Sequence, residues 1–238
     1  MIKSKQLKIQ IFADGANKSD MLELYRSDII SGLTTNPTLM KKAGIINYEA
    51  FCRDILDTIV DKPISFEVFS DEFTEMERQA RLIASWGDNV YVKIPITNSM
   101  GEPSAPLIKK LVSDNIKVNV TAIMTAEQVK SVAVNLNSSV PSYVSVFAGR
   151  IADTGVDPLP IMKDSLDILR KNPKAELIWA SPREVFNVYQ GDQIGCHVIT
   201  VTRDLAEKLA SAGKDLEDFS LETVRMFAAD AEAAGYTL

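Results

Sequence analysis

The sequence predicts an α/β protein of the (β/α)8 (TIM) barrel class with one extra C-terminal helix. Strand-like and helix-like runs alternate from end to end, and eight strand-like runs are each followed by a helical segment. The length of 238 residues fits one such domain, so residues 1–238 are expected to form a single barrel domain. An open doubly wound sheet is disfavoured, because Asp14-Gly15-Ala16 after the first strand is not a Gly-rich phosphate loop.

The eight predicted strands are short runs rich in β-branched and aromatic residues, which suit buried parallel strands. They are Lys8–Ala13, Gly32–Asn36, Ile64–Phe69, Val90–Ile96, Lys117–Ile123, Tyr143–Gly149, Glu176–Ala180 and Val198–Val201.

Helix-like stretches lie between these strands. Examples are Tyr48–Val60, Phe73–Trp86, Ala126–Asn135, Pro158–Lys171 and Arg203–Ser211. Two of them carry start signals, since Thr125 precedes one and Asp157 precedes Pro158 at the start of another. The last amphipathic segment, about residues 216–236, lies outside the eight-unit period. It is expected either to cover the barrel floor or to pack on a neighbouring subunit.

Composition narrows the classes of partner. The net charge is −6 and the isoelectric point about 5.0. Binding to nucleic acid or anionic membranes requires a basic surface, so neither is expected as a partner. The sequence contains no run of eighteen apolar residues, so no transmembrane helix is predicted. Met1–Lys8 lacks the apolar segment of an export signal. The only cysteines, Cys52 and Cys196, are expected to be reduced thiols in the cytoplasm. With only one histidine, His197, no metal site is expected.

A lysine stands in the middle of the fourth strand, in Val90–Ile96. A buried ammonium group is costly unless it is paired, and burial also makes a lysine amine a usable nucleophile. Lys93 alone is equally consistent with a structural ion pair.

The polarity of alternate strand residues decides whether Lys93 is a nucleophile or part of a structural ion pair. Polar side chains recur on one parity, which places them on a common face of the predicted barrel. They are Asp14, Glu67, Lys93, Asn119, Thr121 and Ser145, joined by Asn36 at the end of the second strand. A lysine, two carboxylates, two amides and two hydroxyls that converge indicate an active site more strongly than a buried ion pair.

The residue types suggest a reaction. A lysine amine attacks a ketone to form an iminium, which acts as an electron sink for cleavage of the adjacent carbon–carbon bond. Glu67 with Thr121 is suited to move protons near the nitrogen through a water, and Asp14 to accept the proton of the cleaved alcohol. Asn36 and Asn119 are suited to bind substrate hydroxyls.

Two arginines follow late strands. Arg150 and Arg183 each come just after a predicted strand end, in the loop zone where barrels commonly bind phosphate. Either one alone fits a surface salt bridge, but the pair favours a phosphate pocket.

These residues together resemble the transaldolases, in the short subfamily that includes fructose 6-phosphate aldolases. The matching motifs follow one order through seven strands: Phe12-Ala13-Asp14, Gly32-Leu33-Thr34-Thr35-Asn36-Pro37-Thr38, Val92-Lys93-Ile94-Pro95, Asn119-Val120-Thr121, Ser145-Val146-Phe147-Ala148-Gly149-Arg150-Ile151 and Ala180-Ser181-Pro182-Arg183.

The resemblance implies a Schiff-base lysine, Lys93, with Asp14, Glu67 and Thr121 as the other catalytic residues. It implies substrate binding by Thr35, Asn36, Asn119, Ser145, Phe147, Arg150, Ser181 and Arg183. It further implies sugar-phosphate substrates in the pentose phosphate pathway, no metal or organic cofactor, and a homo-oligomer of five or ten subunits built with the C-terminal helix.

Two positions bear on the reaction type. The aldolase branch carries Gln where Glu67 stands and Tyr where Phe147 stands, so both positions resemble the transaldolase branch. Transfer of a three-carbon unit to an aldose phosphate is therefore favoured over its release. A fructose 6-phosphate aldolase-type lyase, a transaldolase-like enzyme of specialised sugar synthesis and a phosphosugar-binding barrel without turnover remain as alternatives. The family's rim motifs are altered in Thr97–Pro103 and at Pro182, so the donor and acceptor sugars are not predicted.

Overall fold

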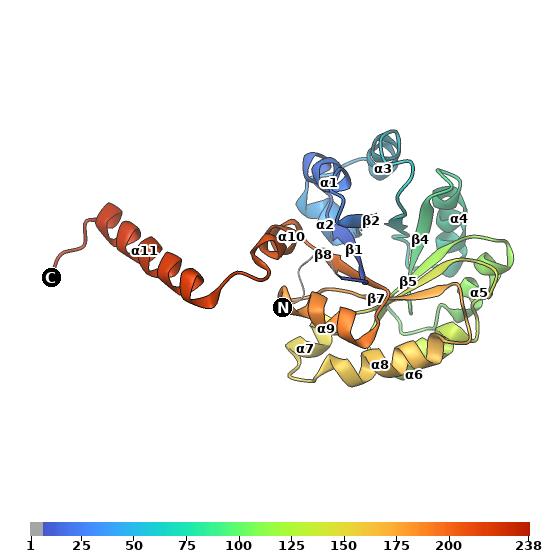
Figure 1. Cartoon of the computed structure of the whole chain (residues 1–238). Helices are drawn as coiled ribbons and strands as arrows, with labels where there is room; N and C mark the ends of the chain where they lie inside the picture. Colours follow the sequence, from blue (N-terminus) through green and yellow to red (C-terminus); the bar gives the residue numbers. More distant parts are fainter. Residues whose placement is uncertain (1–6) are drawn as a thin grey trace.

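The computed structural model describes residues 7–238, in which eight parallel strands close into a barrel. The strands are β1 (Gln10–Asp14), β2 (Ile30–Thr34), β3 (Ile64–Glu67), β4 (Val90–Pro95), β5 (Val118–Ile123), β6 (Ser142–Val146), β7 (Ala175–Trp179) and β8 (Val198–Val201). They pair in sequence order, and β8 returns to pair with β1. Figure 1 shows helices surrounding the strands, so the predicted (β/α)8 barrel is confirmed.

The helices of the described residues alternate with the strands. They are α1 (Lys18–Tyr25), α2 (Pro37–Lys42), α3 (Tyr48–Leu56), α4 (Phe73–Ala84), α5 (Ala105–Ser113), α6 (Ala126–Ala133), α7 (Ala148–Asp153), α8 (Pro158–Leu169), α9 (Phe186–Ile194), α10 (Arg203–Lys208) and α11 (Leu216–Ala234). Both predicted start signals cap their helices: Thr125 forms a capping box with Gln128 on α6, and Asp157 accepts a hydrogen bond from the Leu159 amide on α8.

Two predicted strand ends were wrong in an informative way. Asn36 does not end β2, because its side chain accepts from the Leu39 amide and caps α2 instead. The sixth strand stops at Val146, and Ala148 and Gly149 already belong to α7. Arg150 therefore lies on a short helix above the barrel and not in an extended loop.

The two faces of the strands bury different groups. One parity packs against the helices in a large apolar cluster that includes Ile64, Val92 and Val144. The other parity points into the barrel, where a small separate cluster fills the interior; its members are Phe12, Tyr143, Ile178, Ala180 and Val198, with Tyr91 and Phe147 packed against them. The predicted polar side chains of the strands share this inward parity.

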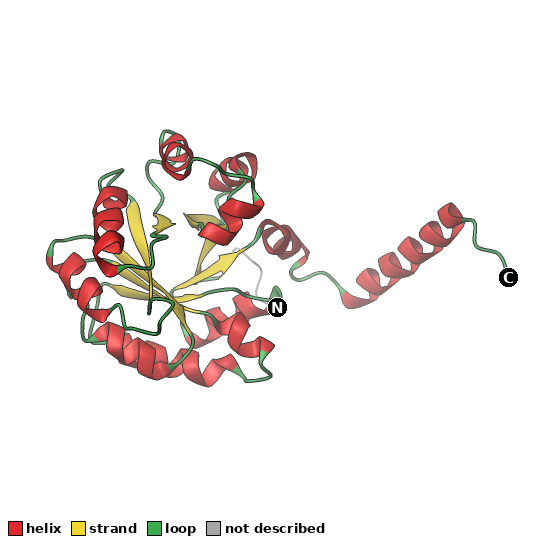
Figure 2. Ribbon diagram, turned by 180° about the vertical axis from the view of Figure 1, so that it is seen from behind, coloured by secondary structure: helices red, strands yellow, loops and turns green. Residues whose placement is uncertain are grey.

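Helix α11 is an exception to the compact packing. It projects from the barrel after α10, as Figure 2 shows from behind, and none of its 19 residues is buried.

Three further expectations from the sequence concern location and thiols. Every helix within residues 7–238 is too short or too polar to span a membrane. Cys52 and Cys196 are buried free thiols. The expectation of no export region concerns mainly residues 1–6, which lie outside the described residues.

Candidate active site

A pocket of about 100 Å3 lies at the C-terminal ends of the strands. Its lining is Asp14, Thr34, Asn36, Lys93, Thr121, Ser145, Phe147, Arg150, Ala180, Ser181 and Thr200. The remaining predicted residues, Thr35, Glu67, Asn119 and Arg183, each contact one of these lining residues instead. The structure thus brings the whole predicted set together in one region. It also places Thr34, Ala180 and Thr200 in the lining, and these three were not among the site residues predicted from the sequence.

Lys93 lies at the centre of the site and is only 6% exposed. Its Nζ donates to the Thr35 carbonyl oxygen at 2.9 Å and lies 3.4 Å from both Thr34 Oγ1 and Glu67 Oε2. Because β3 and β4 pair with Glu67 opposite Lys93, the sheet register itself fixes this contact. These protein groups fix the position of the amine, but Lys93 still lines the pocket, so a bound molecule can reach it.

Asp14 ends β1 beside this lysine. Burial raises the pKa of its carboxyl group to about 6, with the nearby Lys93 lowering it and Glu67 raising it further. Its Oδ1 atom is buried and has no hydrogen-bond partner in the described protein. A carboxyl group that ionises near neutral pH and points into a pocket is suited to general acid–base catalysis.

Glu67 and Thr121 flank the lysine from β3 and β5. Burial raises the pKa of the Glu67 carboxyl group, while the ion pair with Lys93 opposes that rise. Thr121 Oγ1 is buried without a protein hydrogen-bond partner among the described residues. Natively buried hydroxyls are usually bonded, so this oxygen is available to a substrate or a water.

A hydrogen-bond chain runs through the barrel interior from Ser145, which lines the pocket. Ser145 Oγ donates to Asn119 Oδ1 at 2.7 Å, and Asn119 Nδ2 donates to Ser65 Oγ at 3.0 Å. The chain fixes which way the Asn119 amide faces and leaves one Nδ2 proton for a ligand. Ser65 was not among the predicted site residues, although its position two residues before Glu67 gives it the same inward parity.

The two arginines differ in their surroundings. Arg150 lines the pocket from α7, with its guanidinium carbon 5.4 Å from the centre of the Phe147 ring. Arg183 instead makes a two-point ion pair with Asp153, with Nε 2.8 Å from Oδ1, and its Nη1 donates to Ser181 Oγ at 3.1 Å. Arg150 therefore faces the pocket directly, and Arg183 contacts it through Ser181.

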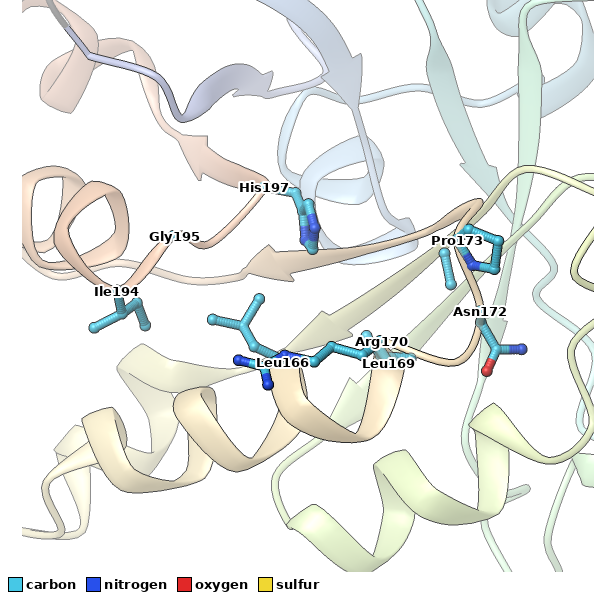
Figure 3. A pocket seen from close by; sticks show the side chains of 9 residues that line it. Leu166, Leu169, Arg170, Asn172, Pro173, Ile194, Gly195 and His197 are labelled. Carbon is cyan, nitrogen blue, oxygen red and sulfur yellow. The ribbon is translucent and has the colours of Figure 1, made fainter.

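A larger hollow of about 340 Å3 lies at the opposite end of the barrel. Figure 3 shows it between the end of α8, where Leu166 lies on the helix and Arg170 directly follows it, and His197 just before β8. His197 Nδ1 accepts a hydrogen bond from the Leu177 amide at 3.0 Å, so the ring links β7 to the residue before β8. Residues at this end of such a barrel usually serve stability, so we interpret His197 as a structural residue.

The fold and site define a class: a (β/α)8 barrel enzyme with a buried lysine paired with Glu67, in a pocket that Asp14 also lines at the C-terminal ends of the strands. Residues 11–238 match the model of the Transaldolase/Fructose-6-phosphate aldolase family. The chain belongs to this family and is a transaldolase-type enzyme.

Named relatives agree with this assignment. The chain is 34% identical over 215 residues to probable transaldolase 2 of Listeria monocytogenes, which covers 89% of this chain and 94% of that protein. It is 36% identical over 194 residues to a probable transaldolase of Clostridium kluyveri, covering 81% and 86% of the two chains.

A solved structure supports the fold alone. A designed cube-shaped, highly porous protein cage made by fusing symmetric oligomeric domains superposes with a TM-score of 0.60 at 12% identity, covering 96% of this chain and 80% of that one.

Proposed function

We propose that the protein is a Schiff-base transaldolase that moves a dihydroxyacetone unit from a ketose phosphate, such as fructose 6-phosphate or sedoheptulose 7-phosphate, to an aldose phosphate. The observation that carries this proposal is Lys93, which is buried yet reached by the pocket and flanked by Glu67 and Asp14. A binding protein has no use for a desolvated amine with two carboxyl groups around it.

The proposed reaction begins at the ketone carbon of the donor. The Lys93 amine adds to it, and loss of water gives an iminium while Glu67 and Thr121 pass protons through a water molecule. The bond between the third and fourth donor carbons then breaks, its electron pair forms an enamine, and Asp14 accepts the hydroxyl proton of the departing aldose.

The second half reverses these steps with the acceptor. The enamine carbon attacks the aldehyde carbon of the acceptor, Asp14 returns the proton to the new hydroxyl, and water hydrolyses the iminium to free Lys93. Phe147 lines the pocket without a hydroxyl that would hold a water near the enamine, which favours transfer over release of dihydroxyacetone.

The pocket also contains the groups that a sugar phosphate requires. Asn36 Oδ1 caps α2, and its Nδ2 donates to no group within residues 7–238, so the amide is suited to donate to a substrate hydroxyl. Arg150 and Ser181, with Arg183 behind them, would bind the phosphate of the aldose part. No metal ion or organic cofactor takes part in the proposed steps.

We propose that the enzyme works in the cytoplasm, in the pentose phosphate pathway.

The test is borohydride trapping with fructose 6-phosphate, with and without erythrose 4-phosphate, read by peptide mass spectrometry. A dihydroxyacetone adduct on the Lys93 peptide that decreases when the acceptor is added is expected. The Lys93→Met variant is expected to form no adduct and to lose at least about 10³-fold in kcat. An adduct on another lysine would overturn the assignment of the nucleophile.

We also propose that α11 packs against a second copy of this chain, in a homo-oligomer of five or ten subunits. Its apolar side chains, including Leu216, Phe219, Val224 and Phe227, are exposed in the single chain, whereas Asp218, Glu222, Arg225 and Glu232 follow the opposite side. A helix of this pattern needs an apolar partner surface to be stable in water.

A further inference from the structure

The backbone around Glu67 lacks its expected strand partner on one side. β2 and β3 pair only at Leu33 with Ile64 and Thr34 with Ser65, and the last backbone bond between them runs from the Thr35 amide to the Ser65 carbonyl. In a parallel pair, alternate residues direct both backbone groups to the same neighbour, so Glu67 faces β2 as Ser65 does. The next bond of this ladder would join the Glu67 amide to the Thr35 carbonyl.

That carbonyl is engaged elsewhere. The Thr35 oxygen accepts from Lys93 Nζ at 2.9 Å, and Asn36 then turns the chain into α2. The arrangement that holds the lysine therefore removes the backbone partner of Glu67 on this side. A buried backbone amide or carbonyl without a partner is costly, because it has lost its hydrogen bonds to water.

Tyr48 supplies both missing partners with one hydroxyl. Its Oη accepts from the Glu67 amide at 2.9 Å and donates to the Glu67 carbonyl oxygen at 2.7 Å. A hydroxyl is one of the few side-chain groups that can accept and donate at one atom in this way. Burial also raises the pKa of Tyr48 far above its ordinary value, so the phenol keeps the proton that it donates.

The ring of Tyr48 is itself fixed from outside the barrel. Tyr48 is the first residue of α3, which Asn47 caps, and its ring packs 5.1 Å from Phe69 and 6.4 Å from Trp86, centre to centre. The hydroxyl thus has a defined position relative to β3, and the tyrosine acts as a substitute for one residue of β2.

We propose that Tyr48 is a positioning residue for the reaction: it holds the backbone of Glu67 so that the Glu67 carboxylate stays 3.4 Å from Lys93. The inference rests on the proposed Schiff-base function, in which Glu67 moves protons beside the lysine. Tyr48 does not line the pocket, and its side-chain hydrogen bonds among the described residues both go to the Glu67 backbone, so its effect passes through Glu67.

The test is a double-mutant cycle on kcat and on the rate of adduct formation in borohydride trapping. Tyr48→Phe keeps the ring and removes the hydroxyl, so kcat is expected to fall about tenfold to a hundredfold with KM changed less than about threefold. In the Glu67→Gln background the same change is expected to cost less than about twofold, because there is no carboxylate left to position.

The matched control is Tyr25→Phe, whose hydroxyl donates to Asp61 at 2.6 Å on the surface. It is expected to leave kcat and adduct formation unchanged. All variants are assayed well below their melting temperatures, so a loss of stability alone does not lower kcat. Equal losses in both backgrounds, or an unchanged kcat in Tyr48→Phe, overturn the inference. A wild-type protein that forms no Lys93 adduct overturns the proposed function instead.

Discussion

Asp14 is the residue whose ionisation is expected to control activity. Its pKa of about 6 in the folded protein lies above the ordinary 3.8, chiefly because of burial. The proposed base must be a carboxylate, so kcat is expected to fall below pH 6 with an apparent pKa near that value. Steady-state rates from pH 4.5 to 8 measure this limb. A kcat that stays constant down to pH 5 would contradict the role of Asp14.

The same shift has a cost in stability. A carboxyl group whose pKa is higher in the folded state favours folding below pH 4, and this contribution is lost as the pH rises through 6. A difference of about two pKa units corresponds to roughly 3 kcal/mol. Asp14→Asn is therefore expected to raise the free energy of unfolding at pH 7 by about 1–3 kcal/mol while reducing kcat severely.

Urea unfolding at pH 4 and pH 7 tests this prediction. The wild type is expected to gain less stability than the variant over that interval, because only the wild type has this carboxyl group to ionise. If Asp14→Asn is the less stable protein at pH 7, the carboxylate is better stabilised by its surroundings than its burial indicates.

The alternation of side chains along a strand was enough to predict which polar residues face the barrel interior. Asp14, Lys93, Thr121 and Ser145 were expected on the inward face, and the closed barrel with period-two strands places them there. The contact of Tyr48 with Glu67 was beyond such reasoning, since it depends on where β2 stops and how α3 packs. Neither is encoded in a local pattern.

At the scale of elements, the junction between β6 and α7 shapes the side of the pocket that Arg150 and Ser181 line. A Cβ atom on Gly149 would lie 1.5 Å from the Ser181 carbonyl oxygen and 3.4 Å from Arg183 Nε. The absence of a side chain there lets α7 approach the loop after β7 closely. The sequence predicted a strand through Gly149, because the run Ser145–Gly149 contains no helix start signal of the usual kind.

Gly149→Ala is expected to push the Ser181 loop away from Arg150. We expect a loss of about 1–3 kcal/mol in stability and a KM for a phosphorylated donor raised at least fivefold, with a smaller change for dihydroxyacetone, which has no phosphate. The comparison is Gly213→Ala, which introduces about 1–2 kcal/mol of strain at φ +83° but meets no atom within 4 Å. A similar rise in KM in both variants would attribute the effect to lost stability and not to the pocket.

At the scale of the whole molecule, the barrel and α11 are built differently. The sheet closes on itself with β8 against β1, and the interior is filled by its own side chains, so the barrel needs no partner to be complete. The sequence predicted this closure from its eight βα units and predicted α11 as an extra amphipathic helix. It left open whether that helix covers the floor, and the structure shows it projecting into solvent instead.

This exposure leads to a prediction about assembly. The apolar side of α11 has no partner among the described residues, so we expect the full chain to be an oligomer by light scattering at micromolar concentration. Ending the chain after Gly213 removes α11 without any buried residue of the barrel, and a folded monomer with the far-ultraviolet spectrum of a barrel is expected.

Point variants separate the apolar side from the charged side of the helix. Phe227→Glu places a charge on the apolar side and is expected to weaken the assembly by at least tenfold in Kd, because a carboxylate would have to be buried without a partner. Glu232→Ala changes the opposite side and is expected to leave the mass unchanged. If Glu232→Ala dissociates the oligomer and Phe227→Glu does not, the helix docks through its charged side; if the full chain is a monomer, α11 has another partner.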